Sequence, residues 1–210
     1  MAASDPLAAA LSTAGAGVSV LGTRLGDTAA TVLAVHPQAS MEEWRNGKGV
    51  LLGQRYLTRQ GYADGGFFQV LLTRKELGSV VWSVTRNTRT RVANHVANHV
   101  ANHMANSAVG HDDNYDTGHT AHAAAGVPAE PILEDYIAEY GPYELLCTER
   151  FAEHAVYHVY WLHAPADCSV PGARPDMPYL YLNLVTGKWT EELLMLVDPA
   201  LGRANGEMAQ

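Results

Sequence analysis

Short apolar runs, bounded by turn-forming residues, dominate the pattern of hydrophobic and polar positions along this chain. In the first half, three such runs are separated by Gly-containing polar stretches: the first alternates imperfectly, the second is continuously apolar, and the third is rich in β-branched and aromatic residues. Runs of this length and composition predict strands, and the short links between them predict an antiparallel meander. We expect these strands at residues 49–58, 67–73 and 79–85.

The second half combines one helix with four more strand-like runs. Apolar residues recur at helical spacing over residues 132–140, with Pro131 near the start and Gly141-Pro142 after the end, which predicts a helix. The turn at Thr186-Gly187 favours a hairpin between the last two runs. The four expected strands cover residues 143–151, 155–163, 179–185 and 188–197; the last run could also be a helix, and the hairpin turn before it favours a strand.

The region before the first meander carries mixed signals. Residues 18–21 and 31–35 read VSVL and TVLAV, which predicts two short strands, and a proline after His36 ends the second. Ser40 and Glu43 have the spacing of a capping box, which predicts one or two helical turns through Trp44.

These elements predict a β-rich α+β fold with a mainly antiparallel sheet, arranged as a meander, barrel or sandwich, and a few short helices. We divide the chain into a β-rich part at residues 1–91, a low-complexity insertion at 92–127, and a helix with antiparallel strands at 128–210. The first and last parts are expected to form one composite domain, since 210 residues suffice for one large domain or two small ones.

The His/Asn/Ala-rich insertion begins with Val-Ala-Asn-His, repeated three times and followed by a partial copy. A period of four gives no straight helical stripe, but the alanine in every copy favours helix over strand. Histidines four residues apart on a helix can share a divalent transition metal such as zinc, nickel or copper. Six histidines are therefore candidate ligands: His95, His99, His103, His111, His119 and His122. The alternative that we favour is replication slippage that left a tolerated surface segment without a cofactor.

The only two cysteines are Cys147 and Cys168. They could pair, but two thiols in a chain without a secretory signal are expected to be reduced and buried. No apolar run approaches the roughly 18 residues of a transmembrane helix, and the start lacks the basic region of a signal peptide. We therefore expect a location in the cytoplasm or within a particle assembled there.

Charge divides the chain unevenly. Residues 1–91 hold ten of the 14 Lys and Arg and six of the 22 Asp and Glu, a net charge of +4, whereas the remainder carries −12. Complementary fields can steer association within one chain or between copies, although ordinary solvated charge explains the counts equally well. Arg86, Arg89 and Arg91 could contact phosphate or nucleic acid, but a solvated rim or pairing with acidic neighbours is the expected arrangement.

No sequence pattern identifies a reaction. Cys147 could act as a nucleophile with His154 or His158 nearby, but nothing local activates it. In the expected strand, His154 and His158 lie about 13 Å apart, too far to share a metal ion. The aromatic residues of the second half could line a ligand cavity or form the packed face of a sheet. We predict no catalytic and no cofactor-binding residues.

We therefore predict a non-enzymatic structural subunit of a larger assembly, such as a virion or a comparable particle. Its partners would be other protein subunits in a homo- or hetero-oligomer, with no membrane and no nucleic acid. The uneven charge and the lack of a catalytic signature are the basis. The alternative is a soluble β-rich binding module for a small ligand or a partner protein, as immunity proteins bind toxins. An enzyme comes third.

Overall fold

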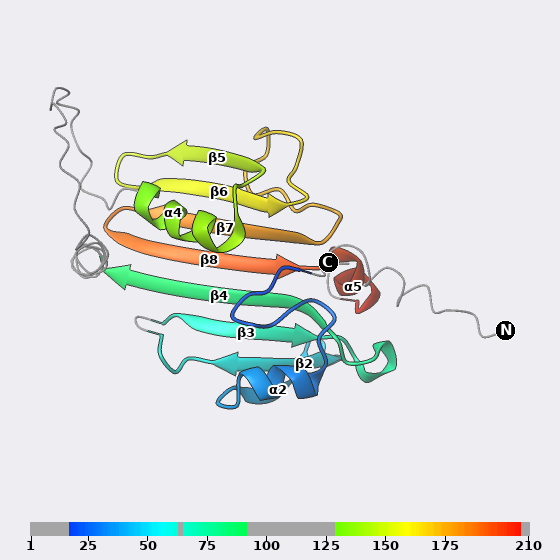
Figure 1. Cartoon of the computed structure of the whole chain (residues 1–210). Coiled ribbons are helices and arrows are strands. Elements are labelled where there is room, and N and C mark those ends of the chain that lie inside the picture. The colour runs from blue at the N-terminus through cyan, green and yellow to red at the C-terminus, as the bar shows by residue number, and fades with distance from the viewer. Residues whose placement is uncertain (1–16, 63–64, 92–128, 207–210) are drawn as a thin grey trace, which may run out of the picture.

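The computed structural model describes residues 17–62, 65–91 and 129–206. Within these ranges, eight strands form one antiparallel sheet in the order β1-β2-β3-β4-β8-β7-β6-β5 (Figure 1). This confirms a β-rich α+β fold with a mainly antiparallel sheet. The repeat lies outside the described residues. The strands are β1 (Ser40–Arg45), β2 (Leu51–Thr58), β3 (Phe67–Leu72), β4 (Val81–Arg91), β5 (Leu145–Arg150), β6 (Ala155–Leu162), β7 (Tyr179–Thr186) and β8 (Trp189–Val197).

The sheet consists of two halves with the same plan. Helix α2 (Ala29–Val35) precedes the meander β1–β4, and helix α4 (Ala129–Tyr140) precedes the meander β5–β8. The final strands of the two halves, β4 and β8, pair antiparallel at the centre of the sheet. Both helices lie on the same face of the sheet (Figure 1). The halves are therefore related by an approximate two-fold axis that passes between β4 and β8, normal to the sheet.

Side chains alternate between two hydrophobic layers. Along β7, Leu180 and Leu182 join the core beneath α2 and α4, while Tyr179 and Tyr181 point the other way. We call the side covered by the two helices the helical face and the opposite side the open face. Helix α5 (Pro199–Ala204) and the β6–β7 loop, residues 163–178, pack on the open face, where Leu201 and Ala164 join its cluster.

Two predictions near the start of the chain are wrong. Residues 31–35 belong to α2 rather than to a strand, because Thr28 caps the helix by accepting a hydrogen bond from the Thr31 amide and Val32 is buried against the sheet. Residues 40–45 form strand β1 rather than a helix. The Ser40 hydroxyl donates to the Leu57 carbonyl of β2 instead of capping a helix. Residues 18–21 contribute one isolated bridge rather than a strand.

The other expected elements are confirmed, with shifted ends. All three strands of the first meander and all four of the second are present, and β4 continues to Arg91, so that Arg86 and Arg89 lie within the strand. Helix α4 begins three residues before the expected start. Two elements were not predicted, α5 and a short 3-10 helix at Lys75–Leu77. None of the helices in the described part of the chain has the length and apolarity to cross a bilayer.

Candidate functional site

A groove of about 480 Å³ crosses the open face where the two halves meet. Its walls come from the end of β1, the β1–β2 turn and the starts of β2 and β4 in the first half, and from the β6–β7 loop, β7, β8 and the segment after α5 in the second. The lining residues are Trp44, Arg45, Asn46, Gly47, Leu52, Trp82, Ser83, Arg174, Tyr179, Met195, Val197 and Gly206. The volume is within the range of small-molecule sites.

A β-bulge places Trp82 in the floor of the groove. In the β3–β4 pair, Leu71 lies opposite Ser83 and Leu72 opposite Val81, which leaves Trp82 as the extra residue. A bulge of this kind re-aims the side chain, and Trp82 joins the cluster of the open face. Its indole N–H is buried and donates to no acceptor among the described residues. A buried donor without an acceptor lowers stability, so Trp82 is placed here at some free-energy cost.

Trp44 forms the adjoining wall of the groove and lies opposite a tightly packed glycine. It lies opposite Gly53 in the β1–β2 pair, and its ring stacks on that of Trp82 with centroids 6.2 Å apart. A Cβ at Gly53 would lie 2.1 Å from the Leu72 carbonyl oxygen, and the φ of Gly53 is +144°. Only glycine fits at this position without displacing β3. Trp44 is half-buried, so one side of its ring remains accessible from the groove.

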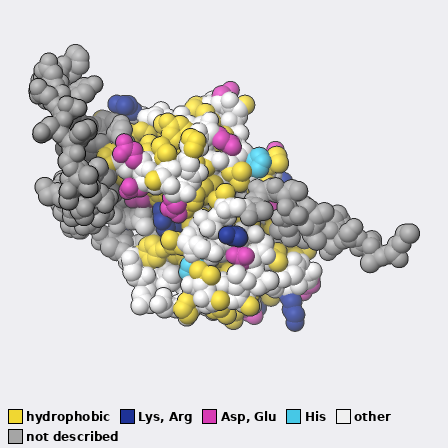
Figure 2. All heavy atoms as spheres, viewed as in Figure 1, with side chains coloured by type: hydrophobic (Ala, Val, Ile, Leu, Met, Phe, Trp, Pro, Cys, Tyr) yellow, Lys and Arg dark blue, Asp and Glu magenta, His cyan; other side chains and the backbone are white. Residues whose placement is uncertain are grey.

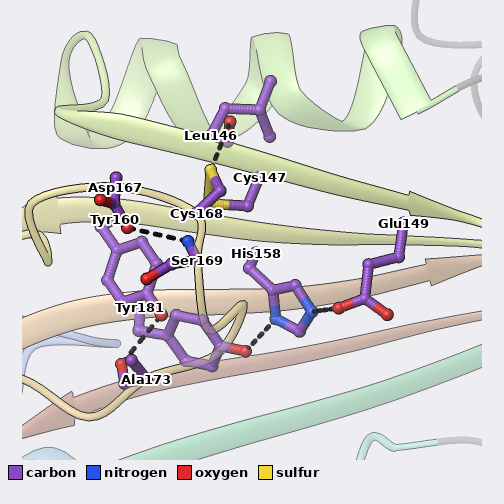
Figure 3. The surroundings of a disulfide bond; sticks show 10 residues. All are labelled: Leu146, Cys147, Glu149, His158, Tyr160, Asp167, Cys168, Ser169, Ala173 and Tyr181. Atoms are coloured by element: carbon purple, nitrogen blue, oxygen red, sulfur yellow. Dashed lines mark hydrogen bonds and ion pairs between the residues drawn. A yellow bond between two sulfur atoms is a disulfide. The ribbon is translucent and has the colours of Figure 1, made fainter.

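A disulfide between Cys147 of β5 and Cys168 pins the β6–β7 loop onto the open face (Figure 3). The expectation of two reduced, buried thiols is therefore wrong. The pairing depends on the loop folding back over the sheet, which the spacing of the cysteines does not reveal. Cys147 is bonded to Cys168 and so carries no thiolate for nucleophilic chemistry.

The same loop packs on three interacting polar side chains beside the disulfide, His158, Tyr181 and Glu149. His158 lies directly opposite Cys147, its Nδ1 is 2.6 Å from the Tyr181 hydroxyl, and its Nε2 is 3.6 Å from a Glu149 carboxylate oxygen (Figure 3). A Cβ at Gly172 would contact the His158 ring and the Tyr181 hydroxyl at 3.3–3.4 Å, so the loop backbone closes over both side chains. Burial lowers the pKa of His158, and Glu149 partly opposes this shift.

The histidines do not form a metal site in the described structure. His154 precedes β6 and stacks on Phe151, whereas His158 contacts Tyr181 and Glu149. No group of His, Cys, Asp and Glu among the described residues is arranged to hold a metal ion. All six candidate ligands of the insertion lie outside the described residues: His95, His99, His103, His111, His119 and His122.

Helix α5 closes the groove at the far end of β8. Asp198 caps the helix by accepting from the Ala200 and Leu201 amides. At the other end, the buried Asn205 donates to the Leu52 carbonyl and accepts from the Arg74 amide, 2.8 Å away. Asn205 thus fastens the last segment of the second half to the first half, next to two residues that line the groove, Leu52 and Gly206.

The only charged side chains among the lining residues are two arginines. The Arg45 guanidinium is held in the β1–β2 turn by Glu43 at 2.7 Å and by the Gly49 carbonyl at 2.9 Å. Among the described residues, Arg174 takes part in no hydrogen bond or ion pair of its side chain. Burial raises the pKa of Tyr179 while the Arg174 charge lowers it, so this charge lies close to the buried phenol. Arg174 therefore gives the groove a positive charge that no described carboxylate pairs with, in a chain of net charge −8.

A second polar cluster joins the halves on the helical face. The Tyr136 hydroxyl accepts from Arg86 at 2.6 Å and donates to Glu192 at 2.7 Å, which links α4, β4 and β8. Burial and the Glu192 charge raise the pKa of Tyr136 well above its usual value. Asp135 and Glu139 extend this cluster around a cavity of about 210 Å³, and Figure 2 shows acidic side chains gathered over α4.

Two arginines of β4, Arg86 and Arg89, contact polar side chains of the second half. Arg86 and Arg89 point to opposite faces of the sheet, so the two do not form one patch. Arg89 lies 3.6 Å from Glu191 and over the Trp189 ring, on the open face. Pairing with acidic neighbours was one of the arrangements expected, and here part of the charge difference between the halves is satisfied within one chain.

Compared with known protein families, curated protein sequences and solved structures, the chain matches none.

Proposed function

We propose that this protein is a binding module that takes a small ligand in the groove of the open face. The observation that supports this most is the composition of the groove. Aromatic and aliphatic side chains provide the walls, and a few polar groups converge at the rim. Small-molecule sites have this make-up, because apolar walls provide affinity and a few placed polar groups provide orientation.

The groove is also built in advance of any ligand. The disulfide holds the β6–β7 loop on one side, and Asn205 holds α5 on the other. A site whose walls are already fixed loses less conformational entropy on binding, which improves affinity. Each of these two constraints holds a segment that contributes a residue to the groove. The loop contributes Arg174, and the segment after α5 contributes Gly206.

A filled-groove variant tests the proposal. Met195 and Leu193 are both half-buried on the open face of β8, but only Met195 lines the groove. Met195→Trp fills the groove, and Leu193→Trp is the matched control. We expect ligand-observed NMR with neutral, anionic and cationic aromatic fragments to detect binders of the wild type that Met195→Trp loses and Leu193→Trp keeps. The proposal fails if no fragment of any charge binds, or if both variants behave as the wild type does.

A structural subunit of a larger assembly, such as a virion, is our second candidate, with other protein subunits as partners. It is supported by the two outer strands, β1 and β5, each of which pairs on one side only within the described sheet. Free strand edges can add a strand of another chain, although β1 carries Glu42, Glu43 and Arg45, which oppose such pairing. Measuring the mass of the untagged protein in solution, alone and in native extract, tests this candidate. A monomer in both would count against it.

The disulfide is informative about the compartment in which the protein functions. Such bonds persist in oxidising surroundings and are rare in the cytosol. It therefore favours an oxidising compartment, or a particle exposed to one after assembly, over the cytoplasm proposed from the sequence. Trapping free thiols with an alkylating reagent in the producing cell, followed by mass analysis of the Cys147 and Cys168 peptides, tests this. Alkylation of both cysteines would support the cytoplasm.

A further inference from the structure

The groove combines an accessible aromatic wall with one unpaired cation. Trp44 presents a half-buried ring that is backed by Trp82, so a flat ligand can stack on its free side. Arg174 is exposed at the rim and has no side-chain hydrogen bond or ion pair among the described residues. A guanidinium at such a position offers a planar set of donors that matches a carboxylate.

The charges around the groove select against a cation. None of the described lining residues is a carboxylate, although Asp and Glu outnumber Lys and Arg by 22 to 14 in the chain. Two acidic side chains that lie close in sequence to the groove arginines form ion pairs, Glu43 with Arg45 and Asp176 with Arg203. The second arginine, Arg45, is held by the β1–β2 turn, and Glu43 offsets its charge, so Arg174 is the arginine of the groove that no described carboxylate pairs with.

We infer that the ligand of the groove is a planar aromatic carboxylate, whose ring lies against Trp44 and whose carboxylate is bound by Arg174. This inference rests on the proposed binding function and specifies its ligand class. The disulfide has a direct part in it, because Cys168 fixes the loop that carries Arg174. The loop is further tied to the sheet by the Tyr160 hydroxyl, which donates to the Ala173 carbonyl at 2.9 Å, next to Arg174.

Three probes with one ring system separate the contributions of shape and charge: naphthalene-1-carboxylate, the neutral naphthalene-1-carboxamide and the cationic 1-naphthylmethylammonium. Dissociation constants would be measured by ligand-observed NMR titration of the full chain. We expect the carboxylate to bind roughly tenfold more tightly than the amide, and the cation to bind weakest. Added salt should weaken binding of the carboxylate and leave that of the amide unchanged.

Arg174→Gln should remove most of this preference, weakening the carboxylate by about fivefold and leaving the amide unaffected. Arg59→Gln is the matched control, since Arg59 is an exposed arginine in the β2–β3 turn that does not line the groove. The inference is overturned if the amide or the cation binds as tightly as the carboxylate, or if Arg174→Gln and Arg59→Gln have equal effects. In those cases, a loss of probe binding in Met195→Trp would show that the groove still binds the aromatic ring. The proposed function would then stand. If no probe binds to the wild type, both are overturned.

Discussion

The two halves of the sheet share a helix followed by a four-stranded meander, but they differ in what is added to that plan. The first half joins its second and third strands by residues 59–66, whereas the second half uses the longer, disulfide-bonded loop at 163–178. The second half also continues into α5 after its last strand. These two additions supply Arg174 and Gly206 to the groove. Part of the groove therefore arises where the halves differ, while their shared plan supplies the sheet beneath it.

The first experiment replaces a glycine that is required in the first half but has no counterpart in the second. Gly53 is the third residue of β2, where the corresponding strand β6 has Tyr157. In Gly53→Ala the new Cβ would collide with the Leu72 carbonyl, so we expect a loss of roughly 4 kcal/mol in the free energy of unfolding. Urea denaturation followed by circular dichroism measures it. Gly47→Ala, at an open position, is the control, and equal losses in the two variants would contradict the prediction.

The second experiment removes the constraint on the longer loop. The disulfide closes a segment of 21 residues in sequence separation. The double variant Cys147→Ala/Cys168→Ser should therefore lose about 3 kcal/mol of stability, chiefly because its unfolded state is less restricted. Ligand binding in the groove should weaken as well, because Arg174 is less well held. Denaturation with and without reductant provides the control, since reductant should destabilise the wild type alone. A reductant effect of similar size in the double variant would exclude the disulfide as its cause.

The third experiment weakens the attachment of α5, the other element that is added in the second half. Asn205→Ala leaves the Leu52 carbonyl and the Arg74 amide without this buried partner, which should cost about 2 kcal/mol. Asp198→Ala, which removes the cap at the opposite end of the same helix, should cost about 1 kcal/mol. Thermal unfolding of both variants gives the ranking. If the cap variant is the less stable of the two, α5 is held by its own helical structure more than by its attachment to the first half.

The smallest expected effect concerns pH. Burial lowers the pKa of His158 below its value of 6.5 in the unfolded chain, so the unfolded state binds more protons in mildly acidic solution. Stability should therefore fall as the pH decreases through 6.5 toward the lower folded pKa. The variant His158→Gln should show a shallower fall, measured as the urea midpoint across this interval. His36, whose pKa is also lowered by burial, accounts for part of the remaining slope. An unchanged slope in His158→Gln would exclude His158 as a contributor.

Much of the sheet could be predicted from the sequence, because its strands are apolar runs separated by turn residues. The errors came where local signals were ambiguous. Ser40 and Glu43 have capping-box spacing, yet Ser40 pairs with Leu57 across the sheet, a contact that local spacing does not encode. The β-branched residues of α2 suggested a strand, but burial of Val32 against the sheet favours the helix. The start of helix α5 is predictable from the sequence, since Asp198-Pro199 combines an N-cap residue with proline at the first helical position.

The groove could not be predicted in the same way. Trp44, Trp82 and Arg174 come from segments far apart in the chain, and the strand pairing, the β-bulge at Trp82 and a folded-back loop bring them together. Bulges have weak sequence signatures, and the disulfide depends on that same fold. The aromatic residues of the second half were recognised as possible cavity walls, and Tyr179 is one of them. The two tryptophans of the groove belong to the first half, where no ligand site was expected.

The main chain crosses between the two meanders only once, between Arg91 and Ala129, and every other strand connection stays within its own half. That crossing contains the Val-Ala-Asn-His repeat. Within each meander every strand pairs with its neighbours in sequence, and the meanders meet along β4 and β8. We therefore expect that the two meanders can be produced as separate polypeptides that reassociate along these two strands.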